Sequence, residues 1–258
     1  MPTWDASQYL RFGDERTRPC HDLAARVAIE QPHKVIDLGS GPGNSTATLA
    51  ARWPQAQIIG LDSSADMIRA ASAAFPARRW IVDDVTHWTD SGDETFDVVF
   101  SNAALQWVDD HAAVFPKLLR RLTAGGALAA QMPANFDAPA HALMREIAES
   151  ASWRDRFAAP VREWHVHEPA FYYDVLAPHA KSLDLWKTEY IHILPDARAI
   201  VQWYKGTGLR PFLQSLRSDE DRAAFENDYL CEISQAFPTR GDGRVLFPFL
   251  RLFIVARV

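Results

Sequence analysis

The 258-residue sequence predicts an α/β fold: a doubly wound, mostly parallel sheet of seven strands with a helical cap. Short apolar segments alternate with helix-like segments through the first half, and a glycine-rich turn follows the first apolar segment. The second half is also longer than closing such a sheet requires. Alternation of strands and helices is typical of parallel sheets that carry helices on both faces.

The apolar segments of the first half are continuous rather than alternating, which is typical of strands buried on both faces. We expect these strands at Lys34–Leu38, Gln57–Leu61, Arg79–Val82, Phe96–Phe100 and Ala127–Gln131. The segments between them predict helices over Asn44–Trp53, Ser64–Phe75 and His111–Leu122. Gly125 and Gly126 are expected to end the last helix, because glycine adopts positive φ at low cost.

About half of the chain follows Met132, roughly twice what one more crossover and a closing strand pair need. We expect the last two strands at Leu183–Thr188 and Leu250–Arg257. The remaining segments, Asp137–His179 and Pro195–Pro238, are helical in pattern and rich in aromatic residues. The sequence therefore predicts one domain over 1–258, in which 133–180 and 195–238 form a helical cap on the half that contains residues 1–132.

The composition excludes several classes of function. With 27 basic and 33 acidic residues the net charge is −6, which disfavours a nucleic-acid partner. No segment approaches the roughly 18 uncharged apolar residues of a membrane span. The N-terminus carries Asp5 and Arg11 where a signal peptide needs an apolar run, so a cytoplasmic protein is expected. His165 and His167 stand at strand spacing without further ligands, so we expect no metal site.

The strongest motif is the turn Val35–Asn44, where a strand runs into three glycines and then a helix. Gly39, Gly41 and Gly43 let the backbone approach a ligand closely, and the helix start offers N–H groups to an anion. A dinucleotide fingerprint would place its third glycine at the position of Asn44, so a dehydrogenase is disfavoured. Asp37, two residues before the first glycine, favours a ligand with an amino group, such as the methionine end of S-adenosylmethionine. A tight turn without a ligand is the alternative interpretation.

The ends of the next strands carry further candidate residues. Asp62 can accept hydrogen bonds from both hydroxyls of a ribose, since Ser63 or Ser64 can cap the following helix instead. Asp83–Val85 can meet an adenine edge, and Ser101–Ala103 can face the sulfonium and amino group of the cofactor. The predicted cofactor residues are Asp37, Gly39, Gly41, Gly43, Asn44, Asp62, Ser63, Met67, Asp84, Val85, Ser101, Asn102 and Ala103.

These motifs resemble those of the class I S-adenosylmethionine-dependent methyltransferases. The segments that carry the resemblance are Asp37–Thr46 (DLGSGPGNST), Leu61–Ile68 (LDSSADMI), Asp83–Val85 (DDV) and Phe96–Trp107 (FDVVFSNAALQW). Five further segments make the chain most similar to the carboxyl O-methyltransferases of small tricarboxylic acids: Trp4–Pro19, Gln131–Pro133, Leu143–Glu146, Thr207–Pro211 and Arg251–Arg257.

The resemblance implies a Rossmann-like fold, with S-adenosyl-L-methionine as cofactor and S-adenosyl-L-homocysteine as product. It also implies that residues 1–132 bind the cofactor, that the helical cap covers the substrate site, and that the product is a monomethyl ester of trans-aconitate or a similar acid. A carboxylate is already ionised at pH 7, so no general base and no catalytic residue are expected. The spare carboxylates need cations, for which arginine is well suited.

The candidate substrate residues are Tyr9, Arg18, Trp107, Tyr172, Arg210 and Arg251. Arg18 and Arg210 are favoured, because each stands beside a proline in a segment predicted to be a loop over the site. Two other functions stay open. A methyltransferase acting on the malonyl thioester of an acyl carrier would need a basic docking patch, and no clustered Lys/Arg run is present. A regulatory module that binds the cofactor without catalysis is the other. Oligomeric state is not predicted.

Overall fold

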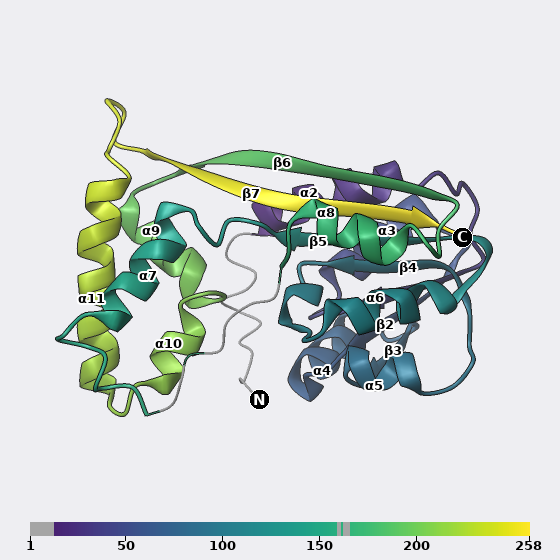
Figure 1. The fold of residues 1–258 in the computed structure, drawn as a ribbon, viewed down its shortest axis with the longest axis horizontal. Coiled ribbons are helices and arrows are strands. Elements are labelled where there is room, and N and C mark those ends of the chain that lie inside the picture. Colours follow the sequence, from purple (N-terminus) through teal and green to yellow (C-terminus); the bar gives the residue numbers. More distant parts are fainter. Residues whose placement is uncertain (1–12, 159–160, 162–165) are drawn as a thin grey trace. The chain divides into compact units, whose positions relative to one another are not determined.

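In the computed structural model of the chain, a seven-stranded sheet has the strand order β3-β2-β1-β4-β5-β7-β6 (Figure 1). The structure describes residues 13–158, 161 and 166–258. The strands are β1 (Lys34–Leu38), β2 (Gln57–Asp62), β3 (Arg79–Val82), β4 (Phe96–Asn102), β5 (Leu122–Pro133), β6 (Ser182–Leu194) and β7 (Val245–Arg257). Strands β1 to β5 pair in parallel, and β7 pairs antiparallel to β5. The predicted α/β fold with a mostly parallel sheet is confirmed.

Helices occupy most of the segments between the strands. They are α2 (Gly13–Arg26), α3 (Asn44–Arg52), α4 (Ala65–Ala74), α5 (Val85–Asp90), η2 (Leu105–Trp107), α6 (His111–Arg120), α7 (Pro139–Glu149), α8 (Pro169–Leu176), α9 (Ala197–Lys205), α10 (Arg210–Ser215) and α11 (Asp219–Ala236). Side chains of Asp110, Asp196 and Ser218 cap the first turns of α6, α9 and α11 by accepting backbone N–H groups. Within the described ranges, none of the helices is long and apolar enough to cross a membrane.

The chain divides into two compact units. The described part of the larger unit comprises residues 13–133, 166–188 and 251–258, and that of the smaller unit comprises 134–158, 161 and 189–250. Strands β1 to β5 belong to the larger unit, and helices α7, α9, α10 and α11 belong to the smaller one. Strands β6 and β7, drawn side by side in green and yellow in Figure 1, each contribute residues to both units.

The larger unit is built on the buried centre of the sheet. Val35, Ile36, Val98 and Val99 are fully buried, as expected for strands covered on both faces. Helix α2 packs on α3 and β5, while α6 packs on α5, α8 and β5. The β1-to-β2 and β4-to-β5 crossovers run in opposite directions along the sheet, so right-handed connections place α3 and α6 on opposite faces.

The smaller unit has its own aromatic core. Helix α11 packs against α7 and α9, and its buried residues Phe225, Tyr229 and Ile233 recur every four positions. Tyr229 Oη donates to the Ala140 carbonyl at 2.9 Å, which ties α11 to α7. The first segment predicted as a helical cap, Asp137–His179, is divided: α7 belongs to the smaller unit and α8 to the larger one. That the helices cover a substrate site stays a prediction.

One predicted helix end is wrong. The helix over His111–Leu122 ends at Arg120, and Gly125 and Gly126 lie inside β5. Leu122 already pairs with Phe96, and the register between β4 and β5 shifts directly afterwards. Gly125 has a φ of +81° and donates its N–H to the Val258 carbonyl at 3.0 Å. The glycines therefore accommodate an irregularity of the strand, not a helix terminus.

The last two strands are longer than predicted. Strand β6 continues past Thr188 to Leu194, and β7 begins at Val245 rather than at Leu250. In these extensions buried and exposed residues alternate: Tyr190 and Leu194 are buried, whereas Ile193 is exposed. Such alternation is typical of a strand with one buried face. The predicted strands were limited to continuous apolar segments, so the alternating extensions of β6 and β7 were not included in them.

Candidate functional site

The three glycines of the β1–α3 turn have positive φ, at +71° for Gly39, +54° for Gly41 and +97° for Gly43. A Cβ on Gly39 would lie 2.1 Å from Ala104 Cβ, and one on Gly43 would lie 3.0 Å from the rings of Phe75 and Trp80. A Cβ on Gly41 would meet nothing within 4 Å. Gly39 and Gly43 are therefore required by packing, and Gly41 alone borders open space.

Asp37 lies at the end of β1 with a fully buried side chain. Its Oδ2 accepts from Ser45 Oγ and Thr46 Oγ1, both at 2.6 Å, so the first turn of α3 fixes the carboxylate. Its Oδ1 is buried and has no hydrogen-bond partner among the described residues. Burial raises the pKa of Asp37 to about 6. This buried oxygen is an acceptor to which none of the described residues donates.

Asp62 joins the ends of β2 and the glycine turn. Its Oδ2 accepts from the Gly41 N–H at 2.9 Å and its Oδ1 from the Ser64 N–H at 2.8 Å. Burial raises the pKa of this carboxyl above its usual value. Ser64 caps α4 by accepting from the Met67 N–H, as predicted, while the neighbouring Ser63 is exposed. The structure thus brings Gly41 and Asp62 together, although they are 21 positions apart.

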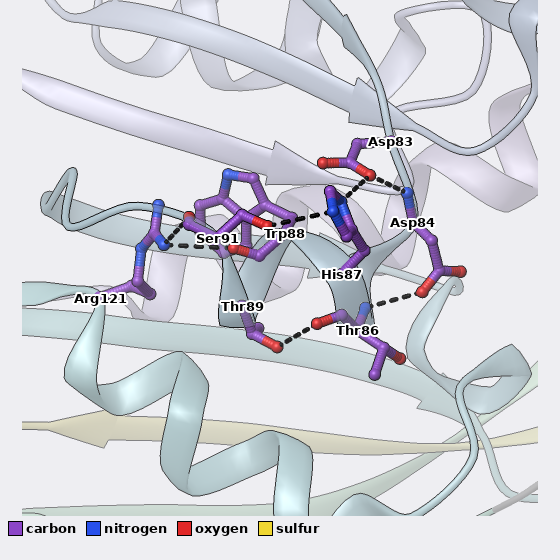
Figure 2. A network of polar contacts seen from close by, with 8 residues as sticks. All are labelled: Asp83, Asp84, Thr86, His87, Trp88, Thr89, Ser91 and Arg121. Carbon is purple, nitrogen blue, oxygen red and sulfur yellow. Dashed lines mark hydrogen bonds and ion pairs between the residues drawn. The ribbon is translucent and has the colours of Figure 1, made fainter.

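Asp83 and Asp84 follow β3 and start a local polar network (Figure 2). Asp84 caps α5, with Oδ1 accepting from the Thr86 N–H at 2.8 Å. Asp83 Oδ1 accepts from the Asp84 N–H at 2.8 Å and lies 2.7 Å from His87 Nδ1, while His87 Nε2 lies 3.2 Å from Ser91 Oγ. The network fixes the backbone at Asp84, while Val85, the first residue of α5, is buried.

Arg121 holds the other end of α5 (Figure 2). Its Nη1 donates to the carbonyls of Trp88, Ser91 and Gly92, and its Nε donates to the Glu94 carbonyl. The guanidinium also lies 4.2 Å from the centroid of the Trp88 ring, a cation–π contact. These contacts could not be predicted from the sequence, because the acceptors are backbone carbonyls.

The end of β4 is shaped by long-range hydrogen bonds. Ser101 is fully buried, and its Oγ donates to the Leu38 carbonyl at 2.9 Å, which makes it a structural residue. Asn102 Oδ1 is buried without a hydrogen-bond partner in the described part of the chain. Ala103 has a φ of +56°; its N–H donates to the Gln131 carbonyl, and its carbonyl accepts from Gln106 Nε2, both at 2.8 Å. Gln106 and Gln131 thus hold a strained turn beside the cofactor candidates.

The candidate substrate residues come from different elements and from both units. Tyr9 lies outside the described residues. Arg18 is exposed on helix α2, so the expectation that its segment is a loop is wrong. Arg210 belongs to the smaller unit, where it begins helix α10 and is partly exposed. Trp107 ends η2 and is partly buried.

Tyr172 and Arg251 are both buried in the larger unit. The Tyr172 hydroxyl lies 2.8 Å from His111 Nδ1 and accepts from the His167 N–H at 3.2 Å, which gives this side chain a packing role between α8 and α6. Arg251 is 3% exposed, and its Nη1 donates to Gln131 Oε1 at 3.2 Å. Of the candidate arginines, Arg251 alone is buried in the part of the chain that the structure describes. No group of three or more His, Cys, Asp or Glu in that part is arranged to hold a metal ion.

Comparisons with known proteins show which family the chain belongs to. The family described as "Methyltransferase domain" matches residues 35–126. A trans-aconitate 2-methyltransferase of Azoarcus sp. (strain BH72) is 50% identical over 99% of both chains, and one of Rhodopseudomonas palustris (strain BisB5) is 48% identical over 99% of both.

Among solved structures, a methyltransferase from Bacillus halodurans C-125 aligns with a TM-score of 0.60 at 15% identity, covering 93% of this chain and 98% of that one. Phosphoethanolamine N-methyltransferase 2 of Haemonchus contortus, solved with S-adenosyl-L-methionine, has a TM-score of 0.56 at 14% identity over 93% and 52% of the two chains. The fold and the glycine turn define a class I S-adenosylmethionine-dependent methyltransferase. Within that class, the chain belongs to the trans-aconitate 2-methyltransferase family.

Proposed function

We propose that this chain transfers a methyl group from S-adenosylmethionine to one carboxylate oxygen of trans-aconitate or a similar small tricarboxylic acid. The products are a monomethyl ester and S-adenosylhomocysteine. The observation that carries the proposal is the 50% identity, over nearly the whole of both chains, with a relative of that name. The similarity covers 99% of both chains, so it extends beyond the cofactor motifs and through both units.

The residues of the glycine turn fit the cofactor. The buried Asp37 Oδ1 lacks a donor in the described structure and suits the ammonium group of the methionine end. The open space beside Gly41 admits a ligand against the backbone. Asp62, with one bond to each oxygen from the backbone, keeps acceptor capacity for ribose hydroxyls. When bound, the cofactor supplies a methyl group activated by its positive sulfur.

The remaining cofactor assignments are part of the same proposal. Ser63, Met67, Asp84 and Val85 would border the adenosine, and Asn102 and Ala103 the reacting end. Gly39, Gly43 and Asn44 shape the turn, and Ser101 supports it from within the sheet. Ser45 and Thr46 were missed by the sequence analysis, although hydroxyls in the first turn after the glycines were a readable signal.

The acid needs alignment and charge compensation rather than a base. A carboxylate with a pKa near 4 is ionised at pH 7 and attacks without losing a proton. The protein then contributes by holding the oxygen in line and by excluding water. The spare carboxylates of the acid require cations, and Arg251, which is buried in the larger unit, is a candidate for one of them.

A methyl-transfer assay tests the proposal. The protein is incubated with methyl-labelled S-adenosylmethionine and a panel of mono-, di- and tricarboxylic acids, a malonyl acyl-carrier thioester and no acceptor, and product masses are determined. We expect one added methyl on the tricarboxylic acid, with loss of the label on mild alkaline hydrolysis of the ester. Labelling of the thioester alone, or cofactor binding without any transfer, would contradict it.

A further inference from the structure

Four polar residues of the larger unit share one face of the sheet. Asp37 on β1 is in register with Phe100 on β4. Two residues further along β4, Asn102 is in register with Gln131 on β5. Residues in register, and residues two apart on one strand, project from the same face. Asp37, Asn102 and Gln131 therefore point to the same side of three neighbouring strands.

The row continues onto β7. Pro133, two residues beyond Gln131, is in register with Arg251, so Arg251 also projects from this face. The hydrogen bond of 3.2 Å from Arg251 Nη1 to Gln131 Oε1 shows that the two side chains meet. The row runs diagonally across three strand spacings and four residues along the strands, so a buried carboxylate on β1 and a buried guanidinium on β7 lie about 20 Å apart at the backbone.

The orientation of the Gln131 amide follows from its partner. A guanidinium has only donors, so the amide oxygen faces Arg251 and the amide nitrogen faces away from it. Gln131 is 0% exposed, and its Nε2 has no acceptor among the described residues. A buried amide nitrogen without an acceptor has lost its hydrogen bond to water without compensation, which is unfavourable. A ligand that brings an acceptor to this place would remove that cost.

We propose that Arg251 and Gln131 form a subsite for one spare carboxylate of the substrate, an inference that rests on the proposed function. A carboxylate has two oxygens, which can accept from the guanidinium and from Gln131 Nε2 together. The charges of the row then orient the two reactants: the cofactor's ammonium group lies toward Asp37, and the acid's carboxylate lies toward Arg251. Asn102 stands between them, beside the strained turn at Ala103.

Three variants test the subsite. Arg251→Met removes the charge at similar length, and Gln131→Glu replaces the donor by a negative charge at nearly unchanged shape. Arg257→Met is the matched control. Arg257 lies on the same strand and face as Arg251, but it is six residues further along β7, where it pairs with Ala127. For each variant, calorimetry measures the Kd of S-adenosylhomocysteine and then, with that ligand bound, the Kd of trans-aconitate. Steady-state kinetics give KM and kcat.

We expect trans-aconitate Kd and KM to rise at least about tenfold in Arg251→Met and Gln131→Glu, with the S-adenosylhomocysteine Kd within twofold of wild type. Arg257→Met should match wild type. Three monoamides of the acid, each with one carboxylate replaced by a neutral amide, distinguish carboxylate binding by Arg251 from a purely structural role of this residue. One monoamide should bind wild type about tenfold more weakly than the acid, and Arg251→Met should show no such difference, because the removed charge and the removed carboxylate are partners.

The outcomes separate the two proposals. If wild type methylates the acid but both variants keep its Kd within twofold, the subsite is overturned and the function stands. If Arg251→Met weakened the binding of the acid and of all three monoamides by the same factor, the subsite would also be overturned, since the substitution would then disturb the whole binding site. If wild type neither binds nor methylates any acid of the panel, the proposed function fails and the subsite fails with it.

Discussion

The glycine turn of the larger unit and the helical core of the smaller one hold their buried polar groups in opposite ways. Asp37 in the turn is bound by Ser45 and Thr46, eight and nine positions away. In the smaller unit, the Tyr204 hydroxyl accepts from Asn135 Nδ2 at 3.0 Å and lies 3.2 Å from His141 Nδ1, and these partners are 69 and 63 positions away. The first arrangement is encoded locally, whereas the second exists only once the helices have packed.

The two regions also differ in charge. Asp37 is buried with an oxygen that lacks a partner in the described structure, and its pKa is raised to about 6 by burial. Burial lowers the pKa of His141 to about 3, so this residue is neutral at pH 7 and serves as a hydrogen-bonding group. The turn therefore carries a charge that a ligand can compensate, and the helical core carries none at His141. Variants in the two regions should accordingly separate binding from stability.

The largest effect is expected within the turn, where substitutions of Gly39 and Gly41 should have different consequences. Gly39→Ala should lower the free energy of unfolding by about 3–5 kcal/mol, because its Cβ would overlap Ala104 at a positive φ. Gly41→Ala should cost only about 1–2 kcal/mol for its φ, yet weaken S-adenosylmethionine binding at least about tenfold. Urea unfolding without cofactor and calorimetric titration measure the two quantities. Equal losses of stability in both variants would contradict the distinction.

Much of the turn could be predicted from the sequence, since its motif lies within about ten residues. The pattern indicated the strand, the glycines and the helix that follows them, and it indicated that a serine caps α4. It did not distinguish Gly41 from Gly43, because Phe75 and Trp80, which fill the space at Gly43, come from elsewhere in the chain. The sequence shows where the glycines stand, but only the packed structure shows whether the space beside each one is filled by side chains or open.

The other site residues could be predicted less well, because their contacts also join residues that are far apart in the sequence. Gln131 was included in a predicted strand, yet nothing local showed that it would meet Arg251, 120 positions away. Tyr172 stays a candidate for the substrate, and nothing local showed that its hydroxyl would lie beside His111, 61 positions away. A polar residue at the end of a buried strand is nevertheless a readable signal, and it would have singled out Gln131.

The next largest effect is expected at Asp37, whose negative charge favours cofactor binding but lowers the stability of the fold without cofactor. Asp37→Asn should weaken S-adenosylmethionine binding by about 2–3 kcal/mol, since a neutral amide cannot compensate an ammonium group. Calorimetry at pH 7.5 measures this loss. In wild type, affinity should also fall below pH 6 as Asp37 takes up a proton, and the variant should lack that dependence. A cofactor Kd in the variant within twofold of wild type would show that Asp37 only supports the turn.

The stability of the same variant should change in the opposite direction. Because the folded pKa lies above the unfolded value, Asp37 contributes stability below pH 4 that is lost as pH rises through about 6. Asparagine imitates the protonated form at every pH. Without cofactor, Asp37→Asn should therefore be more stable than wild type by about 1–3 kcal/mol at pH 7.5, and equal to it near pH 4. Urea unfolding at both pH values checks the sign.

The smallest effect is expected in the helical core, and it tests the other side of the comparison. Tyr204→Phe removes the hydroxyl between Asn135 and His141 without changing the ring. The Asn135 amide then loses its acceptor in a place where its Oδ1 already has no partner among the described residues. The expected cost is about 1–2 kcal/mol of unfolding free energy, with the Kd of S-adenosylmethionine unchanged. Tyr173→Phe is the control: this tyrosine is 55% exposed, so its change should stay within about 0.5 kcal/mol. If Tyr204→Phe instead weakened cofactor binding about tenfold at unchanged stability, its network would belong to the binding site, and the separation between a local charged turn and a long-range neutral core would not hold.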